Sequence, residues 1–239
     1  MEERPSIKPG REIVAAFRAL TQKPFLTLVL VDILLALGNL SITQLTRVEA
    51  SAQILFLTFS STLFFGVAAV YLQIAVTLAA ASTQGETHGA DPWLKAALRQ
   101  RCFWRLVGAS LLAAFFVMAG TLMLVIGAIV VGSAVALTQP AVVLERKRPV
   151  AAINRSGELT KPVRRAVGVI FAVLWFAPAA LSFALTWGAE LPNMAQIPFS
   201  VCSAIFYMAA TIAFARVFVQ LGGAPAPPVQ TLLYKARAG

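Results

Sequence analysis

Residues 106–144 form an uninterrupted stretch of 39 positions without a charged side chain. A single α-helix of that length would run roughly 58 Å at 1.5 Å per residue, whereas the hydrocarbon core of a bilayer is only ~30 Å thick. The stretch must therefore fold back on itself, and we expect a tight turn around Gly120–Gly127. It predicts two membrane-spanning helices, over about 106–122 and 125–144.

Four further apolar blocks have the length that a membrane-spanning helix needs. They cover about 25–44, 54–81, 166–187 and 198–221. Hydrophobic residues make up 59% of the chain and charged residues 13%, and a soluble protein of 239 residues could not hide so much apolar surface. The sequence therefore predicts an all-α polytopic integral membrane protein with about six transmembrane helices.

Three short segments outside these blocks combine apolar and basic residues at helical spacing. They cover 11–22, 91–105 and the residues that follow Pro149. Such amphipathic helices are typical of the membrane interface. Because each precedes a pair of apolar blocks, one single membrane domain over 11–221 has three possible repeats: 11–81, 91–144 and 149–221. Residues 1–10 and 222–239 are expected to be tails. The alternative is that interfacial helices converge on Ala, Leu and Arg by composition alone.

The net charge of +10 is concentrated between the apolar blocks. Of the 20 Lys and Arg residues, 18 fall in the N-terminal tail, the connections at 82–105 and 145–165, and the C-terminal tail. Under the positive-inside rule, these connections and both termini lie on the cytoplasmic side of a bacterial-type inner membrane. The same face is expected to attract anionic lipid headgroups. Nucleic acid is not expected as a partner.

Sequence patterns of catalysis and metal binding are missing. The chain has no Gly-x-Ser-x-Gly elbow, no Gly-rich phosphate loop and no His-Glu-x-x-His pattern, and His88 is its one histidine. We therefore expect neither an enzyme nor a cofactor or metal site.

Asp32 is the most informative single residue because it interrupts the apolar block at 25–44. An ionised carboxylate there is costly and usually faces a bundle interior or an aqueous cavity. It could be a proton or cation site, or a partner of Asn39 or Gln73. The alternative, favoured because no basic partner lies within the blocks, is a protonated or hydrogen-bonded packing residue.

Residues 140–161 carry a local motif. A proline-apolar-Glu segment, Pro140–Glu145, is followed by Ala152, Arg155, Ser156 and Leu159 in the spacing Ala-x-x-Arg-Ser-x-x-Leu. This resembles the membrane domain found with some bacterial glycerophosphodiester phosphodiesterases and the related stand-alone YciC-like proteins. The resemblance implies a six-span inner-membrane protein. It does not imply hydrolysis, because the sequence contains no phosphodiesterase catalytic domain.

Four residues are candidates for contact with lipid or a partner protein. Arg155 and Ser156 could hold a lipid phosphate through charge-assisted hydrogen bonds, with Glu145 pairing with Arg155 or Arg148. The alternative is that Glu145 and Arg155 pin the amphipathic helix to the bundle. Arg216 is expected to extend to the interface, where it could also meet lipid phosphate.

These observations favour a non-enzymatic inner-membrane protein that contacts anionic lipids or membrane-protein partners, in envelope or lipid organisation. The alternative is a small transporter or lipid translocase that uses Asp32. The alternative predicts a polar, water-accessible pocket at Asp32.

Overall fold

The computed structural model describes residues 7–48, 52–82, 90–100, 102–121, 124–176, 178 and 193–227, and within them all regular structure is helical. The all-α prediction is therefore confirmed for this part of the chain. In chain order the elements are α1 (Pro9–Leu20), α2 (Phe25–Val48), α3 (Ala52–Ala81), α4 (Ala90–Arg99), α5 (Phe103–Thr121), α6 (Leu124–Val135), α7 (Thr138–Glu145), α8 (Pro149–Thr160), the 3-10 turn η1 (Lys161–Val163), α9 (Arg164–Phe171), the π-helical turn η2 (Ala172–Phe176) and α11 (Asn193–Gln220).

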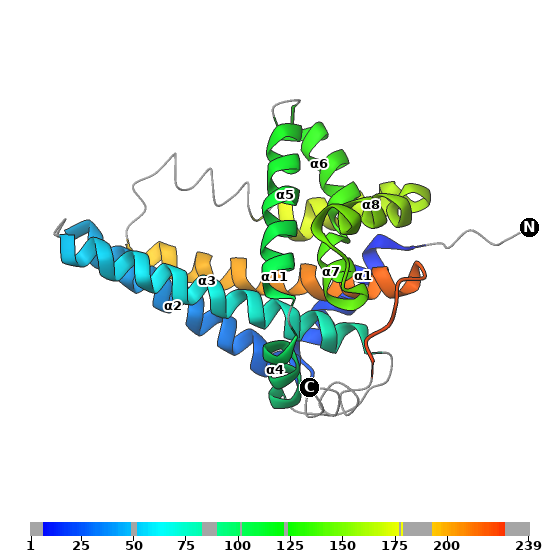
Figure 1. The fold of residues 1–239 in the computed structure, drawn as a ribbon. Helices are drawn as coiled ribbons and strands as arrows, with labels where there is room; N and C mark the ends of the chain where they lie inside the picture. Colours follow the sequence, from blue (N-terminus) through cyan, green and yellow to red (C-terminus); the bar gives the residue numbers. More distant parts are fainter. Residues whose placement is uncertain are drawn as a thin grey trace, which may run out of the picture.

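Two groups of long helices make up the fold. Helices α2, α3 and α11 contact one another and lie side by side as a layer (Figure 1). Helices α5 and α6 form a hairpin that rises across this layer rather than running alongside it, and the shorter helices gather where the two groups meet (Figure 1). A single bilayer normal cannot run along both groups, so the number of helices that cross the membrane stays a prediction.

Among the described residues, four helical segments are long and apolar enough to cross a membrane: Phe59–Ala81, Phe103–Gly120, Ile126–Glu145 and Ile197–Gln220. Helix α1 with residues Phe25–Ser41 of α2 makes a fifth candidate only as a pair, bent by 82°. The expected span at 166–187 is described as far as Phe176 and at residue 178, and its remainder lies outside the described residues.

The outer surfaces of both helix groups are apolar. Leu34 and Phe59 on the layer, and Leu111 and Ile126 on the hairpin, are each at least 67% exposed. Exposing so many large apolar side chains to water is unfavourable, whereas their contact with lipid acyl chains is not. The structure therefore supports a membrane-embedded helical protein.

The span expected over 125–144 is interrupted. Helix α6 ends at Val135 and α7 begins at Thr138, with a two-residue turn between them. Pro140 explains this break, because proline has no N–H for the carbonyl of Ala136 and its ring crowds that carbonyl. The sequence predicts one continuous helix over about 125–144 and does not predict the turn at residues 136–137.

Each expected interfacial segment contains a helix, although the second is shorter than expected. Helix α4 ends at Arg99, and residues 103–105 already belong to α5. Helix α1 packs on α11, α4 on α3 and α8 on α7. Each short helix therefore contacts the last helix of the expected repeat before its own, and the first repeat follows the third in this order. The closely packed positions are alanines, since Ala16, Ala96 and Ala152 are all buried. A three-unit repeat would produce this arrangement, and the repeat itself stays a prediction.

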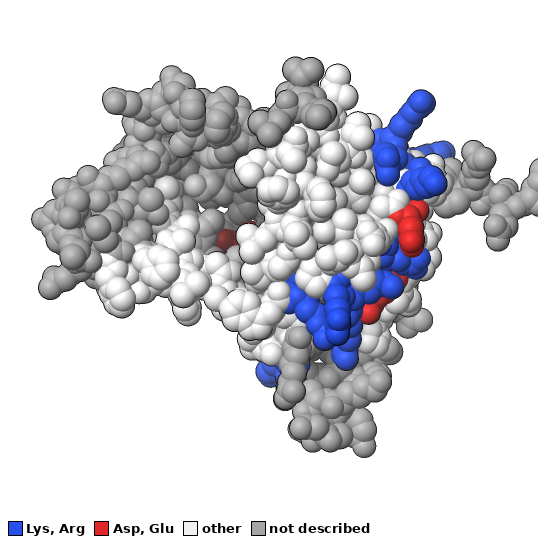
Figure 2. Space-filling view, turned by 45° about the horizontal axis from the view of Figure 1, so that its top comes forward, with Lys and Arg blue, Asp and Glu red and all other residues white. Residues whose placement is uncertain are grey.

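Basic side chains gather at one end of the described molecule. Figure 2 shows Lys and Arg clustered over the end where α1, α7 and α8 lie, away from the arm formed by α2 and α3. Helix α2 begins at this end, after Lys23, while α3 and α11 end there. This end is called the basic end below.

Candidate functional site

Asp32 lines a cavity between α2, α3 and α11. The cavity has a volume of about 660 Å³. Its polar lining consists of Asp32, Asn39, Thr62, Ser200, Ser203 and Tyr207. On the face drawn in Figure 2, a hollow with acidic atoms at its floor lies apart from the basic side chains. Pockets of this volume are typical of small-molecule sites.

Small residues leave the space between the three helices open. Ala36, Gly66, Ala69 and Ala204 all line the cavity, and none of them has a side chain longer than a methyl group. The ring of Phe65 rests against Gly38 of α2, where an added Cβ would lie 2.8 Å from the ring atom Cζ. Gly38 therefore lets the tip of this ring approach α2 closely, and Phe65 forms part of the cavity wall.

A polar cluster continues from Asp32 toward the basic end; Gln73 is buried in it, whereas Tyr207, which also lines the cavity, is 36% exposed. Gln73 of α3 donates a short hydrogen bond to the side-chain carbonyl of Gln139 on α7. The side chain of Tyr207 on α11 lies close enough to both amide side chains and to Asp32 for its hydroxyl to interact with all three. Four helices thus contribute one polar group each, so the Asp32 cavity and the broken span α6–α7 are physically connected.

The cavity is closed toward the basic end. Asp32 lies seven residues into α2, about 10 Å from the start of the helix. On the side of Asp32 that faces the basic end, four side chains are buried: Leu28, Gln73, Thr77 and Thr211. The lining residues Asn39, Thr62 and Ser200 lie on the other side of Asp32, toward the opposite end. The polar space therefore extends away from the basic end.

Two of the four residues in this cluster, Asp32 and Gln73, were identified as candidates from the sequence. Asn39 and Gln73 were considered as partners of Asp32, and Gln73 belongs to the cluster while Asn39 lines the cavity. Gln139 and Tyr207 were missed. Gln139 lies beside Pro140 in an otherwise apolar block, and this pair of residues was the available signal.

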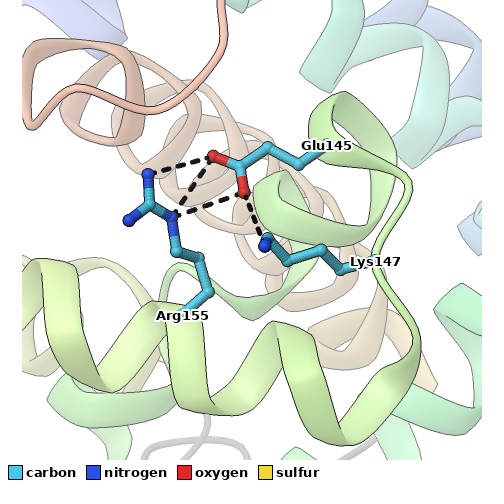
Figure 3. A network of polar contacts seen from close by, with 3 residues as sticks. All are labelled: Glu145, Lys147 and Arg155. Carbon is cyan, nitrogen blue, oxygen red and sulfur yellow. Dashed lines mark hydrogen bonds and ion pairs between the residues drawn. The ribbon is translucent and has the colours of Figure 1, made fainter.

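The Glu145 group lies elsewhere. The guanidinium of Arg155 on α8 contacts both carboxylate oxygens of Glu145 at the end of α7, with its Nε 3.4 Å from each (Figure 3). Lys147 reaches the same carboxylate at 3.5 Å (Figure 3). Glu145 is largely buried, with 14% of its side chain exposed. These contacts connect α7 to α8, and none of the three residues lines the Asp32 cavity.

Ser156 bridges the break between α6 and α7. Its hydroxyl donates a 2.6 Å hydrogen bond to the carbonyl oxygen of Ala134 and accepts one of 3.0 Å from the backbone N–H of Leu137. Both backbone groups lack a helical hydrogen-bond partner because the helix is interrupted between α6 and α7. Because Ser156 is fully buried, it replaces water as their partner.

We expect Ser156→Ala to lower the free energy of unfolding by about 1–3 kcal/mol, because a buried N–H and a buried carbonyl both lose their partner. The measurement is the thermal midpoint of the detergent-purified protein. Ser133→Ala is the matched control, since Ser133 is equally buried but bonds only to Val130 of its own helix. Equal midpoints for the two variants would contradict the bridging role.

Arg216 also pairs within the protein. Its Nε lies 3.5 Å from the carboxylate of Glu12 on α1, and Gln220 donates a 3.1 Å hydrogen bond to the same carboxylate. Glu12 is buried and was not expected at a site. Its position four residues before the buried Ala16, on the same helix face, was the signal that could have found it.

The described fold and cavity define a class: a helical, membrane-embedded protein with a polar site among apolar helices. Comparisons with protein-family models, curated proteins and solved structures gave no match to this chain. The resemblance to the phosphodiesterase-associated membrane domain therefore stays a prediction.

Proposed function

We propose that this protein is a small membrane transporter that binds a cationic solute at Asp32. The observation that carries the proposal is the cavity of about 660 Å³ that Asp32 and Tyr207 both line, between apolar helices. A carboxyl group at such a position is retained at a considerable energetic cost and is typical of substrate and ion pathways. A packing role alone gives no reason for an open polar space beside it.

The chemistry of the lining favours a cation. No Lys, Arg or His stands among the described residues that line the cavity, so a negative charge on Asp32 has no fixed counter-charge there. Phe65, Phe199 and Tyr207 add aromatic rings, whose faces attract organic ammonium and similar ions. A monovalent organic cation, or a cation exchanged for a proton at Asp32, fits this combination.

The function favoured by the sequence was contact with lipid or partner proteins through Glu145, Arg155, Ser156 and Arg216. The contacts described above support the structural alternative for these residues, because each already has a partner within the protein. We therefore do not base lipid recognition on them. The proposal involves no covalent chemistry, and the protein is not proposed to be an enzyme.

The six-span topology stays a prediction, because α5 and α6 run across α2, α3 and α11 (Figure 1). For the transport function the proposed bilayer normal runs along α2, α3 and α11, in a bacterial-type cytoplasmic membrane with the basic end and both termini on the cytoplasmic side. This orientation is supported by the gathering of basic side chains at one end (Figure 2). In this orientation the Asp32 cavity extends toward the outer leaflet, and the Gln73–Gln139–Tyr207 cluster separates it from the cytoplasmic side.

Two ions of nearly equal shape and opposite charge test the binding step. Tetraphenylphosphonium should bind the detergent-purified protein saturably in a calorimetric titration, and tetraphenylborate should not. Asp32→Asn should weaken the cation's binding by roughly tenfold or more. Glu158→Gln removes the same charge from an exposed position on α8 and should change nothing. Equal cation affinity in wild type and Asp32→Asn would overturn the proposal.

A further inference from the structure

A second concave site lies on a different side of the bundle, between α6 and α9. It has a volume of about 960 Å³ and none of its lining residues belongs to the Asp32 cavity. Its lining is Ile7, Ile129, Val130, Ser133, Lys161–Ala166, Gly168, Val169 and Ala172. We call it the α6–α9 groove.

The α6–α9 groove is basic at one end. Lys161, Arg164 and Arg165 line it and are exposed. Among the described residues, no acidic side chain forms an ion pair with any of the three, whereas Lys147, Arg155 and Arg216 all pair with a glutamate. The groove therefore has a concentrated positive charge that the described part of the protein does not neutralise.

The rest of the α6–α9 groove is apolar. Ile129 and Val130 on α6 face Val169 on α9 and Ala172 at the start of η2, five to eight residues beyond Arg164. Along a helix this separation is about 7–12 Å. Val130 and Val169 are each nearly half-exposed. A phosphate at the basic end would thus have an apolar channel directly beside it, at the depth of the first acyl carbons.

We propose that the α6–α9 groove binds one anionic phospholipid, with its phosphate at Lys161, Arg164 and Arg165 and an acyl chain along Val130 and Val169. A free phosphate would use the basic end and leave the apolar walls empty, so the combination selects a lipid. The α6 wall of the groove belongs to Ile126–Glu145, a segment long and apolar enough to cross a membrane, so a bilayer would supply this ligand. This inference is independent of the transport function proposed for Asp32.

Native mass spectrometry of the detergent-purified protein with phosphatidylglycerol or phosphatidylcholine tests this site. Wild type should bind phosphatidylglycerol roughly tenfold or more tightly than phosphatidylcholine, because each basic group near a phosphate adds to the attraction. The triple variant Lys161→Gln, Arg164→Gln, Arg165→Gln should lose this preference. A charge-matched control, Arg11→Gln, Arg18→Gln, Lys95→Gln, changes residues outside the groove and should keep it.

Two further arms separate the alternatives. Val169→Trp fills the apolar wall without changing charge and should weaken phosphatidylglycerol binding, which attraction by charge alone would not predict. Millimolar inorganic phosphate should not displace the lipid. Equal losses in the two triple variants, normal binding by Val169→Trp, or displacement by phosphate would each overturn the lipid site. Asp32→Asn should bind lipid as wild type does, so failure of the transport proposal leaves this test intact.

Discussion

Replacement of Asp32 by asparagine is expected to reduce the flux of a cationic solute through the protein to the level of protein-free vesicles. Asparagine keeps the size and hydrogen-bonding capacity of the side chain but cannot carry the negative charge that a cation needs in an apolar surrounding. Wild type in proteoliposomes should move tetramethylammonium, a small cation that crosses protein-free bilayers only very slowly, at least roughly tenfold faster than this background, because loss of a charge contact of about 1.4 kcal/mol alone weakens binding at Asp32 by that factor.

Folding and function can be separated in this experiment. The asparagine variant should elute from size-exclusion chromatography as wild type does, because a neutral amide is easier to bury than a carboxylate. Asp32→Glu restores the charge in the same cavity and should recover part of the flux. If the asparagine variant transported as fast as wild type, the assignment of Asp32 to the solute pathway would be wrong.

A large effect on stability is expected from Gly132→Ala. An added Cβ at this position of α6 would lie 2.2 Å from the Cε1 atom of Phe171 on α9. Phe171 is buried and stacked on Trp175 at 5.1 Å, so its ring has little room to move. Overpacking of this kind costs about 1–3 kcal/mol, and the thermal midpoint of the purified protein should fall accordingly.

Two variants sharpen this test. Gly132→Ala combined with Phe171→Leu removes the ring that the new methyl group strikes and should recover part of the loss. Gly157→Ala is the matched control in α8, where an added Cβ meets nothing within 4 Å. Alanine there should stabilise the helix by about 0.5–1 kcal/mol. A fall in the midpoint for Gly157→Ala similar to that for Gly132→Ala would mean that glycine replacement itself, and not the contact with Phe171, is responsible.

The sequence predicts which segments are helical, because apolar block length and helix-breaking residues are local properties. The start of α2 after Pro24 and the packing of α6 against α5 follow from this reasoning. The break between α6 and α7 does not follow, because its position depends on Ser156, which is 19 residues away in the chain from Leu137. A proline inside a helix can bend the helix or interrupt it. Which of these occurs depends on whether another side chain can hydrogen-bond to the backbone N–H and carbonyl groups that lose their helical partners.

The candidate site was likewise only partly predictable from the sequence, because contacts between distant parts of the chain form it. Asp32 could be recognised from the sequence, because a carboxylate in an apolar block is unusual wherever the helix packs. Tyr207 and Gln139 are ordinary residues in the sequence, and they matter only because α11 and α7 bring them beside Asp32 and Gln73. Likewise, Lys161, Arg164 and Arg165 look like any basic connection until the apolar groove beside them is known.

The central claim is that water and solutes reach Asp32 between α2, α3 and α11. Labelling of an introduced thiol by a charged, water-soluble reagent in intact membranes tests it directly. Cys102 and Cys202 are first replaced by alanine, and Ser203→Cys is then compared with Leu34→Cys. Ser203 lines the cavity, whereas Leu34 does not and is 68% exposed on the apolar surface. The account predicts rapid labelling at position 203, slowed by tetraphenylphosphonium, and none at position 34. Equal protection of both positions would contradict it.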